Sequence, residues 1–350
     1  MTARQKLPFT SPYLLAPMQG VTEPSFRERV LERNGPGALG GTFTEFCRVV
    51  RTPLPRRVLS AHLGEKRFPQ PVGLQLMGSD AQAMAQTAAR AVEISAPLID
   101  LNFGCPAKGA LRGCAGAALL DEPARVEELV RAVRKAIGEE TPLSAKIRAG
   151  GEDDRNVEAL ARAVEGGGAD LLIVHARTRR EGYSVAADWR RLERAVGAVS
   201  IPVCGNGGIH EYGDLERLRR TTGCALAMVG RAALADPWIF SGGGVSRGEA
   251  ARFLIDYAAG LMDRGACTLE SALRRVKQLL RYWTAGGLVT DDNRLSWLRE
   301  ENPEALMARL ERALGGEEIG RNRADSGELL GDLTCRRGAQ REHGRSIHER

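Results

Sequence analysis

The sequence predicts a (β/α)8 barrel followed by a small all-helical C-terminal domain. Up to about residue 240, short apolar runs alternate with longer amphipathic segments, which is the rhythm of βα repeats and a parallel sheet. The apolar runs number eight, and a length of 350 residues holds a barrel of about 250 residues together with an accessory domain. Polar residues stand at the ends of these runs, where such a barrel collects its chemistry.

The runs and the segments between them give the expected elements in order. Strands are predicted at Tyr13–Ala16, Ala38–Thr44, Pro71–Met77, Pro97–Asn102, Leu143–Arg148, Leu171–His175, Ile201–Gly205 and Ala225–Val229. Helical spacing of apolar residues predicts helices that include Ala81–Ile94, Pro123–Ile137, Asn156–Glu165 and Tyr212–Thr221. A doubly wound sheet is the alternative, but the G-x-G-x-x-G turn that should follow its first strand is absent from the sequence.

The chain divides into four segments. Residues 1–240 are expected to form the barrel, and the Gly-rich residues 241–248 a linker. Residues 249–314 carry helical patterns, the clearest at Thr268–Trp283 with Thr268 as its N-cap. In residues 315–350, charge, Gly and Ser replace apolar periodicity, so this tail is expected to be disordered.

Composition narrows the class of protein. With 43% hydrophobic and 27% charged residues, the chain is typical of globular proteins. No apolar run approaches the roughly 18 residues of a membrane span and the N-terminus has no secretory pattern, so a cytoplasmic location without a membrane is expected. The seven cysteines form no C-x-x-C pair and no histidine stands at ligand spacing, so neither a disulfide framework nor a metal site is expected.

The net charge of +6 is unevenly distributed. Charges balance within residues 249–312 and within 315–350, so the basic surplus lies in residues 1–248. A basic chain suits an acidic partner such as RNA. The predicted helix at 268–283 is itself basic, which fits either a solvated face or a contact with RNA.

Uncommon polar residues stand at or near the predicted strand ends: Gln75, Asn102, Lys146, His175 and Asn206. Because an unpaired buried polar group costs about 1–3 kcal/mol, a polar ligand in the mouth of the barrel is expected. Gln75 can bond the pyrimidine edge of an isoalloxazine ring, and Lys146 can place positive charge near its N1 and O2 atoms, which suits a flavin. Lys146 alone could equally form a Schiff base, as in aldolases.

Two glycine loops follow the last two predicted strands. Residues 204–209 read CGNGGI, and Val229 is followed by Gly230 and Arg231. In a barrel of this kind, the last two loops bind phosphate through backbone N–H groups and a helix N-terminus. Glycine can stand in a tight turn only because a side chain would clash there. Two glycine loops in consecutive βα units, one of them ending in Arg231, instead favour a phosphate-bearing cofactor.

Cys105 lies just beyond the fourth predicted strand, on a Gly-Cys-Pro turn. Most cysteines are small buried hydrophobes. This position, at the catalytic end of the barrel, would instead leave the sulfur exposed, so Cys105 is the candidate reactive residue.

With these features together, the chain resembles the tRNA-dihydrouridine synthase family. The matching segments span residues 16–237 in the family's order, and as a set they are highly specific. They are APMQGVTEPSFR (16–27), TEF (44–46), QLMG (75–78), DLNFGCPAK (100–108), GAALL (116–120), KIRAG (146–150), HARTRREGY (175–183), GNGGI (205–209) and MVGRAALADP (228–237). RVKQLLRYW (275–283) is similar to the family's RNA-binding helical domain. FTEFCRVV (43–50) and HARTRREGY resemble the bacterial C subgroup, which is associated with uridine 16.

The resemblance implies a flavin enzyme that reduces the C5–C6 double bond of a D-loop uridine in tRNA, with FMN as cofactor and NADPH as reductant. By matching position, the residues that would hold FMN are Pro17, Met18, Gln19, Gln75, Lys146, His175, Asn206, Gly207, Gly208, Gly230 and Arg231. Cys105 would be the general acid that protonates C5 after hydride reaches C6, and Asn102 would bond the uracil edge.

The implied partner is tRNA, and the protein is expected to act as a monomer. A uridine must be pulled out of folded tRNA, so phosphate contacts must hold the RNA. The candidates are Arg177 at the barrel rim and Arg274 and Lys277 on the basic helix. Two other interpretations stay open at this stage: an FMN barrel acting on a free pyrimidine or on dihydroorotate, and a catalytically silent tRNA-binding protein.

Overall fold

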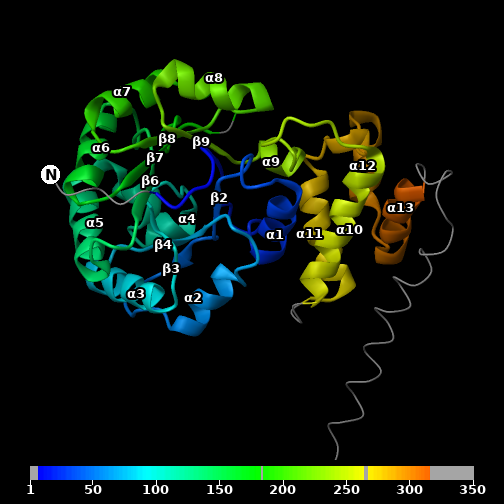
Figure 1. Ribbon diagram of the computed structural model, residues 1–350, viewed down its shortest axis with the longest axis horizontal. Helices are drawn as coiled ribbons and strands as arrows, with labels where there is room; N and C mark the ends of the chain where they lie inside the picture. The colour runs from blue at the N-terminus through cyan, green and yellow to red at the C-terminus, as the bar shows by residue number, and fades with distance from the viewer. Residues whose placement is uncertain (1–6, 183, 264–266, 316–350) are drawn as a thin grey trace, which may run out of the picture.

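The computed structural model describes residues 7–182, 184–263 and 267–315. Nine parallel strands within these ranges form one sheet, in the order β2-β1-β9-β8-β7-β6-β5-β4-β3. A further pairing of β2 with β4 closes the sheet into a barrel (Figure 1). The strands are β1 (Tyr13–Leu15), β2 (Gly41–Phe43), β3 (Cys47–Arg48), β4 (Val72–Met77), β5 (Ile99–Asn102), β6 (Leu143–Arg148), β7 (Leu171–His175), β8 (Val203–Asn206) and β9 (Leu226–Val229).

The second predicted strand, Ala38–Thr44, is interrupted. Strand β2 ends before Thr44 and the chain resumes as β3, and both pieces pair with β4. The Thr44 hydroxyl accepts the hydrogen bond of the Gln75 backbone N–H at 3.0 Å, where a regular strand would offer a carbonyl. Glu45 turns aside to accept from the backbone N–H of Gly20. Such side-chain bonds compete with the backbone ladder, and apolar periodicity does not reveal them. The other seven strands are confirmed.

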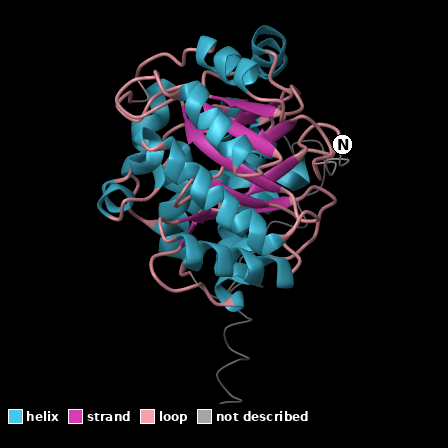
Figure 2. Ribbon diagram, turned by 90° about the vertical axis from the view of Figure 1, so that its left-hand side faces the viewer, coloured by secondary structure: helices cyan, strands magenta, loops and turns pink. Residues whose placement is uncertain are grey.

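Helices between the strands cover the outside of the barrel (Figures 1 and 2). In α5, the buried residues Val126, Leu129, Val130 and Val133 recur at spacings of three and four, so one stripe of the helix packs inward. The four helices predicted in this region are confirmed to within one residue at either end. The helices are α1 (Pro24–Arg33), α2 (Arg56–Leu63), α3 (Ala81–Glu93), α4 (Lys108–Arg112), α5 (Pro123–Ile137), α6 (Val157–Gly166), α7 (Arg190–Ala198), α8 (Tyr212–Thr222) and α9 (Ala232–Ala235), with a 3-10 turn η1 (Gly116–Asp121).

The remaining helices lie to one side of the barrel, next to α1 and α9 (Figure 1). They are α10 (Arg247–Asp263), α11 (Leu269–Leu280), α12 (Asp291–Arg299) and α13 (Pro303–Gly315), with a 3-10 turn η2 (Ala285–Gly287). Helix α10 begins inside the predicted linker because Ser246 and Glu249 exchange hydrogen bonds as a capping box. Helix α11 begins after Thr268, whose hydroxyl accepts from the Ser271 backbone N–H at 3.3 Å, so the predicted N-cap is confirmed.

These helices pack against the first βα unit of the barrel. The Phe26 ring on α1 meets Phe253 and Tyr257 on α10 edge to face, at centroid distances of 6.2 and 5.9 Å. The Tyr257 hydroxyl also lies beside Glu23, with Arg275 of α11 close to both. The C-terminal helices therefore contact the loop that precedes α1, which carries the first of the predicted cofactor residues.

The barrel interior is filled by apolar side chains from several strands, among them Leu14, Phe43, Ile173 and Met228. A larger apolar cluster lies between the strands and the surrounding helices. None of the helices in the described ranges is long and apolar enough to cross a membrane. Beyond Gly315, the predicted tail lies outside the described residues.

Candidate active site

The loop after β5 holds Cys105 by hydrogen bonds to the end of its own strand. The Oδ1 atom of Asn102 accepts from the backbone N–H groups of Gly104 and Cys105, both at 3.0 Å. From the next strand, Arg148 Nε donates to the Gly104 carbonyl at 2.9 Å. The Cys105 side chain is half-buried and packs near Met77. The predicted reactive cysteine is thus fixed at the C-terminal end of the barrel with part of its surface exposed.

A buried polar network lies beneath this loop. Gln75 donates from Nε2 to Asp100 at 2.6 Å and accepts at Oε1 from Asn102 Nδ2 at 2.8 Å. Ser144 donates to the other carboxylate oxygen of Asp100, also at 2.6 Å. Asp100, Gln75 and Ser144 are fully buried. Burial raises the pKa of Asp100 to about 7, although the hydrogen bonds from Ser144 and Gln75 oppose this rise.

Positive charge gathers at the ends of β6 and β7. Lys146 Nζ donates to Asn206 Oδ1 at 3.2 Å, and burial lowers the Lys146 pKa to about 8. The pKa of His175 lies well below its ordinary value, first because the ring is buried and then because nearby cations repel a further charge. Those cations are Lys146, Arg148, Arg177 and Arg231. His175 is therefore neutral near pH 7, in surroundings that favour an anionic ligand.

The predicted phosphate loops use glycine where the backbone requires it. Gly207 and Gly208 have φ angles of +103° and +75°, which other residues rarely adopt. A Cβ atom on Gly207 would lie 3.3 Å from His175 Nε2, and one on Gly230 would lie 4.0 Å from Met18 Sδ. The loop after β8 therefore lies against His175, and the loop after β9 lies against the loop after β1.

The loop after β1 is a tight turn. The Met18 backbone N–H donates to the Thr22 hydroxyl at 2.8 Å, and the Thr22 backbone N–H returns to the Met18 carbonyl at 3.0 Å. Pro17 and Met18 are half-buried, whereas Gln19 is exposed. This turn presents all three predicted residues at the same end of the barrel as Gly230.

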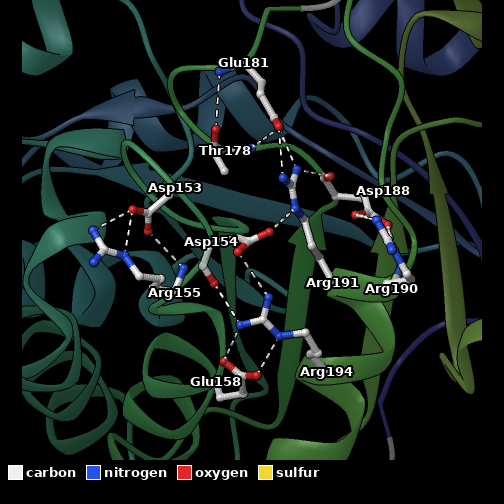
Figure 3. Close-up of polar contacts among 11 residues, drawn as sticks. Asp153, Asp154, Arg155, Glu158, Thr178, Glu181, Asp188, Arg190, Arg191 and Arg194 are labelled. Atoms are coloured by element: carbon white, nitrogen blue, oxygen red, sulfur yellow. Dashed lines mark hydrogen bonds and ion pairs between the residues drawn. The ribbon is translucent and has the colours of Figure 1, made fainter.

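Ion pairs join the two rim loops that follow β6 and β7 (Figure 3). Arg191 on α7 donates to Glu181 at 2.6 and 2.9 Å and to Asp154 at 2.7 Å. Arg194 also contacts Asp154, at 3.2 Å, and extends the network to Glu158 at 2.7 Å. These loops border a cavity of about 470 Å3 that is lined mainly by charged side chains. None of the predicted site residues lines it, so the network braces the rim beside the mouth of the barrel.

The structure brings most of the predicted catalytic and cofactor residues to one end of the barrel, but it separates the three predicted RNA contacts. Arg177 is 5% exposed and donates from Nε to the Val185 carbonyl at 2.6 Å, so it lies beneath the rim rather than on it. Arg274 is exposed on α11 and pairs with Glu270 at 2.6 Å. Lys277, one turn along, donates to the backbone carbonyl of Glu300.

Sequence reasoning missed Asp100 and Ser144, which hold Gln75 from beneath. Asp100 follows Leu98 and Ile99 in an apolar strand, and a carboxylate is rarely buried without partners. That position is the sequence signal for a buried polar network. Its partners come from neighbouring strands, so the sequence does not show which groups complete it.

Comparison of the chain with known proteins identifies its relatives. The family model described as Dihydrouridine synthase (Dus) matches residues 14–291. A tRNA-dihydrouridine(16) synthase of Cupriavidus necator is 39% identical over 231 residues, which cover 64% of this chain and 71% of that protein. The tRNA-dihydrouridine(16) synthase of Haemophilus influenzae is 38% identical over 231 residues, covering 64% of this chain and 74% of that protein. Among solved structures, histamine dehydrogenase from Rhizobium sp. 4-9 aligns with a TM-score of 0.49 at 15% identity, over 65% of this chain and 45% of that chain.

Proposed function

The chain belongs to the dihydrouridine synthase family, and from that premise we propose that it reduces a D-loop uridine of tRNA to 5,6-dihydrouridine. The two relatives described above are named for uridine 16, and we assign the same position here. FMN is the cofactor in this proposal and NADPH is the reductant.

The observation that carries the proposal is the positive charge around Lys146 and His175, next to a glycine loop. A flavin mononucleotide presents an anionic phosphate and a ring that becomes anionic on reduction, and both suit these surroundings. Gly207 has no side chain at the position where a Cβ would approach His175, so its backbone can lie close to a ligand. The residues assigned to FMN are Pro17, Met18, Gln19, Gln75, Lys146, His175, Asn206, Gly207, Gly208, Gly230 and Arg231.

Gln75 needs a separate account because it is fully buried. One Nε2 hydrogen goes to Asp100, and its Oε1 accepts from Asn102. The amide nitrogen has a second hydrogen, which is the atom that would reach the pyrimidine edge of the flavin ring. Lys146, whose Nζ donates to Asn206, would place positive charge beside the same ring.

In this proposal C6 of the uracil ring accepts the hydride that FMN would supply when bound and reduced. The ring then needs a proton at C5, and Cys105 is the donor in this proposal. Its side chain is partly exposed just beyond the end of β5, and its backbone N–H is held by Asn102. The second Nδ2 hydrogen of Asn102 would bond a uracil carbonyl and orient the ring beside the thiol. Positioning of this kind sets the distance over which the proton moves.

We assign tRNA binding to both parts of the chain, with residues 1–240 as the catalytic barrel, 241–248 as the connection and 249–314 as the RNA-binding helical domain. Arg274 is exposed on α11 and can reach a phosphate. Lys277 is half-buried and donates to the Glu300 carbonyl, so in this assignment a phosphate takes one of its two remaining N–H groups. Arg177 acts differently in this assignment. Because it is buried beside His175, its charge contributes to the positive potential of the mouth instead of contacting RNA at the surface.

The test is direct mapping of the product. Unmodified transcribed tRNA is incubated with FMN-loaded protein and NADPH, digested, and examined by mass spectrometry for a nucleotide that has gained two hydrogens. The gain is expected at position 16, and a transcript with cytidine at that position should show none. Reduction of free uracil without reduction of tRNA would favour a small-molecule enzyme. A protein that binds tRNA but cannot be loaded with FMN would favour a silent RNA-binding protein.

A further inference from the structure

We propose that Asp100 is a positioning residue, which fixes the directions of the Gln75 and Asn102 amides and through them the position of Cys105. The proposal rests on the function proposed above, because it concerns how Cys105 meets the uracil ring. Its physical basis is the run of hydrogen bonds that crosses β4 and β5 from Asp100 to the Cys105 loop, here called the Asp100 relay.

The relay begins at a carboxylate that is wholly enclosed. Asp100 is fully buried, and its two oxygens accept from Gln75 Nε2 and Ser144 Oγ, each at 2.6 Å. An ionised carboxylate can only accept hydrogen bonds, and a protonated one still has an oxygen that accepts. Asp100 therefore draws the NH2 group of Gln75, rather than its oxygen, in either protonation state.

The hydrogen bond to Asp100 fixes the orientation of the Gln75 amide, which in turn fixes that of the Asn102 amide. With Nε2 of Gln75 turned to Asp100, its Oε1 faces Asn102 and accepts from Nδ2 at 2.8 Å. The Oδ1 atom of Asn102 is then left to accept from the backbone N–H groups of Gly104 and Cys105, both at 3.0 Å. A backbone N–H can only donate, so the far end of the relay requires the same amide orientation as the near end.

The agreement between the two ends distinguishes the relay from an ordinary structural contact. If either amide turned over, two donors or two acceptors would face each other, and at the fully buried Gln75 water cannot compensate. Each amide is therefore held in one orientation. The same hydrogen bonds fix the direction of the second N–H hydrogen of each amide. In the proposed reaction, these are the hydrogens that meet the flavin and uracil rings, so Asp100 acts on both without touching either.

Three substitutions separate this role from simple support of the fold. Asp100→Asn keeps an oxygen that can accept from Gln75 and lets its NH2 group face the Ser144 hydroxyl, so the relay is preserved. Asp100→Leu has similar bulk and removes the acceptor. Ser144→Ala removes the other hydrogen bond of Asp100 but leaves the link to Gln75, so it is the control for loss of a buried contact.

Each variant is purified with FMN, and three quantities are measured: the alkylation rate of Cys105 by iodoacetamide from peptide mass spectrometry, the flavin reduction potential, and kcat with KM for tRNA. We expect Asp100→Leu to speed Cys105 alkylation by about threefold to tenfold, as loss of one hydrogen bond that holds the loop predicts. It should also shift the flavin potential and lower kcat by about tenfold or more, with KM changed by less than about threefold. Asp100→Asn and Ser144→Ala should each change the alkylation rate by less than about twofold, because both keep the hydrogen bond to Gln75.

Equal effects of Asp100→Leu and Ser144→Ala on alkylation and kcat would overturn the proposal, as would Cys105 alkylation in Asp100→Asn that is as fast as in Asp100→Leu. If Asp100→Leu does not fold, Gln75→Leu breaks the relay at its next link, and unchanged Cys105 alkylation in that variant would overturn the proposal. The alkylation comparison needs no tRNA reduction. A parent protein that makes no dihydrouridine therefore defeats the proposed function, while the alkylation rates still judge the relay.

Discussion

Lys146 donates a hydrogen bond from Nζ to Oδ1 of Asn206 over 3.2 Å, which joins β6 to β8 across the intervening β7. Burial of an ammonium group is unfavourable, and the Lys146 pKa of about 8 records that cost. An anionic ligand at this position would offset it. The buried Lys146 ammonium group therefore lowers the stability of the cofactor-free protein and favours binding of a negatively charged cofactor.

The Lys146 pKa predicts how stability depends on pH. Between pH 8 and the ordinary lysine pKa of 10.5, the unfolded chain holds a proton that the folded protein has released. The stability of the FMN-free protein, relative to Lys146→Met, should therefore rise across this window by about 1–3 kcal/mol. Urea unfolding of both proteins at several pH values measures this change in stability. Lys135→Met, at an exposed position of α5, is the control for removal of a charge. A flat or falling difference would contradict the assigned burial.

Cys105→Ala should retain FMN and tRNA binding but lose most turnover, by about 10²–10⁴-fold, because removal of a positioned acid has that effect. Cys114→Ala is the paired control, since Cys114 is exposed in the loop after α4. Single-turnover dihydrouridine formation from tRNA measures the difference. Near-parental rates in Cys105→Ala would remove this thiol from the mechanism.

Gly116 supports Cys105 from the following turn. Its φ angle is +60°, and a Cβ there would lie 2.9 Å from the Cys105 carbonyl oxygen. Gly116→Ala should therefore displace the Cys105 loop and lower turnover about tenfold, beyond a stability loss of about 1 kcal/mol. Gly138→Ala shares the backbone strain, with φ of +69°, but meets no atom within 4 Å. Thermal unfolding and turnover of the two variants separate the effect of backbone strain from displacement of the Cys105 loop. Equal turnover in both variants would contradict the predicted displacement.

The rim network should make stability sensitive to acid. Hydrogen bonds from Arg191 hold the pKa values of Asp154 and Glu181 below their usual range. A carboxyl group whose pKa is lowered by folding stabilises the folded protein at pH values above its unfolded-state pKa. This stabilisation is lost as the pH falls, so the difference in stability between the parent and Arg191→Ala should narrow below about pH 4.5. The gap at neutral pH should be about 1 kcal/mol. Arg190→Ala, whose side chain is 83% exposed, should change stability by less than about 0.5 kcal/mol. A gap that widens in acid would exclude this origin.

Arg274→Glu should weaken tRNA binding and reduce the slope of log Kd against log salt by about 1, since one phosphate contact is lost. Arg131→Glu is a close control. Each arginine is mostly exposed, at 69% and 62%, and each pairs with a glutamate one helical turn earlier. Arg131 lies on α5, outside the assigned RNA-binding helices. Filter-binding titrations at several salt concentrations measure both variants, and identical slopes would contradict the assignment of α11.

The fold was largely predictable because its strands and helices are marked by apolar period and by turns. Helix α5 is the clearest case, since its inward stripe defines both ends. The break between β2 and β3 was not predictable, because the Thr44 hydroxyl takes over from a backbone carbonyl. The early start of α10 was missed although Ser246 and Glu249 form a recognisable capping pair. Local side-chain bonds of this kind decide element ends more than periodicity does.

The candidate site was predictable where a residue stands at a strand end. His175 ends β7, Lys146 lies two residues before the end of β6, and Cys105 lies three residues beyond β5, all at the C-terminal end of the barrel. Depth within the barrel was harder to predict, since strand position alone does not say that Arg177 lies beneath the rim. Partners were hardest, because Asp100 and Ser144 meet only through the pairing of β5 with β6.

The pairing of β1 with β9 has a consequence for how the protein is made. Leu15 lies opposite Val229, so β1 finds one of its neighbours only when the other barrel strands have been synthesised. Contacts between segments so far apart in the chain form slowly. Until then, the apolar edge of β1 is open to other nascent chains, and chaperones that shield such edges should bind the incomplete polypeptide.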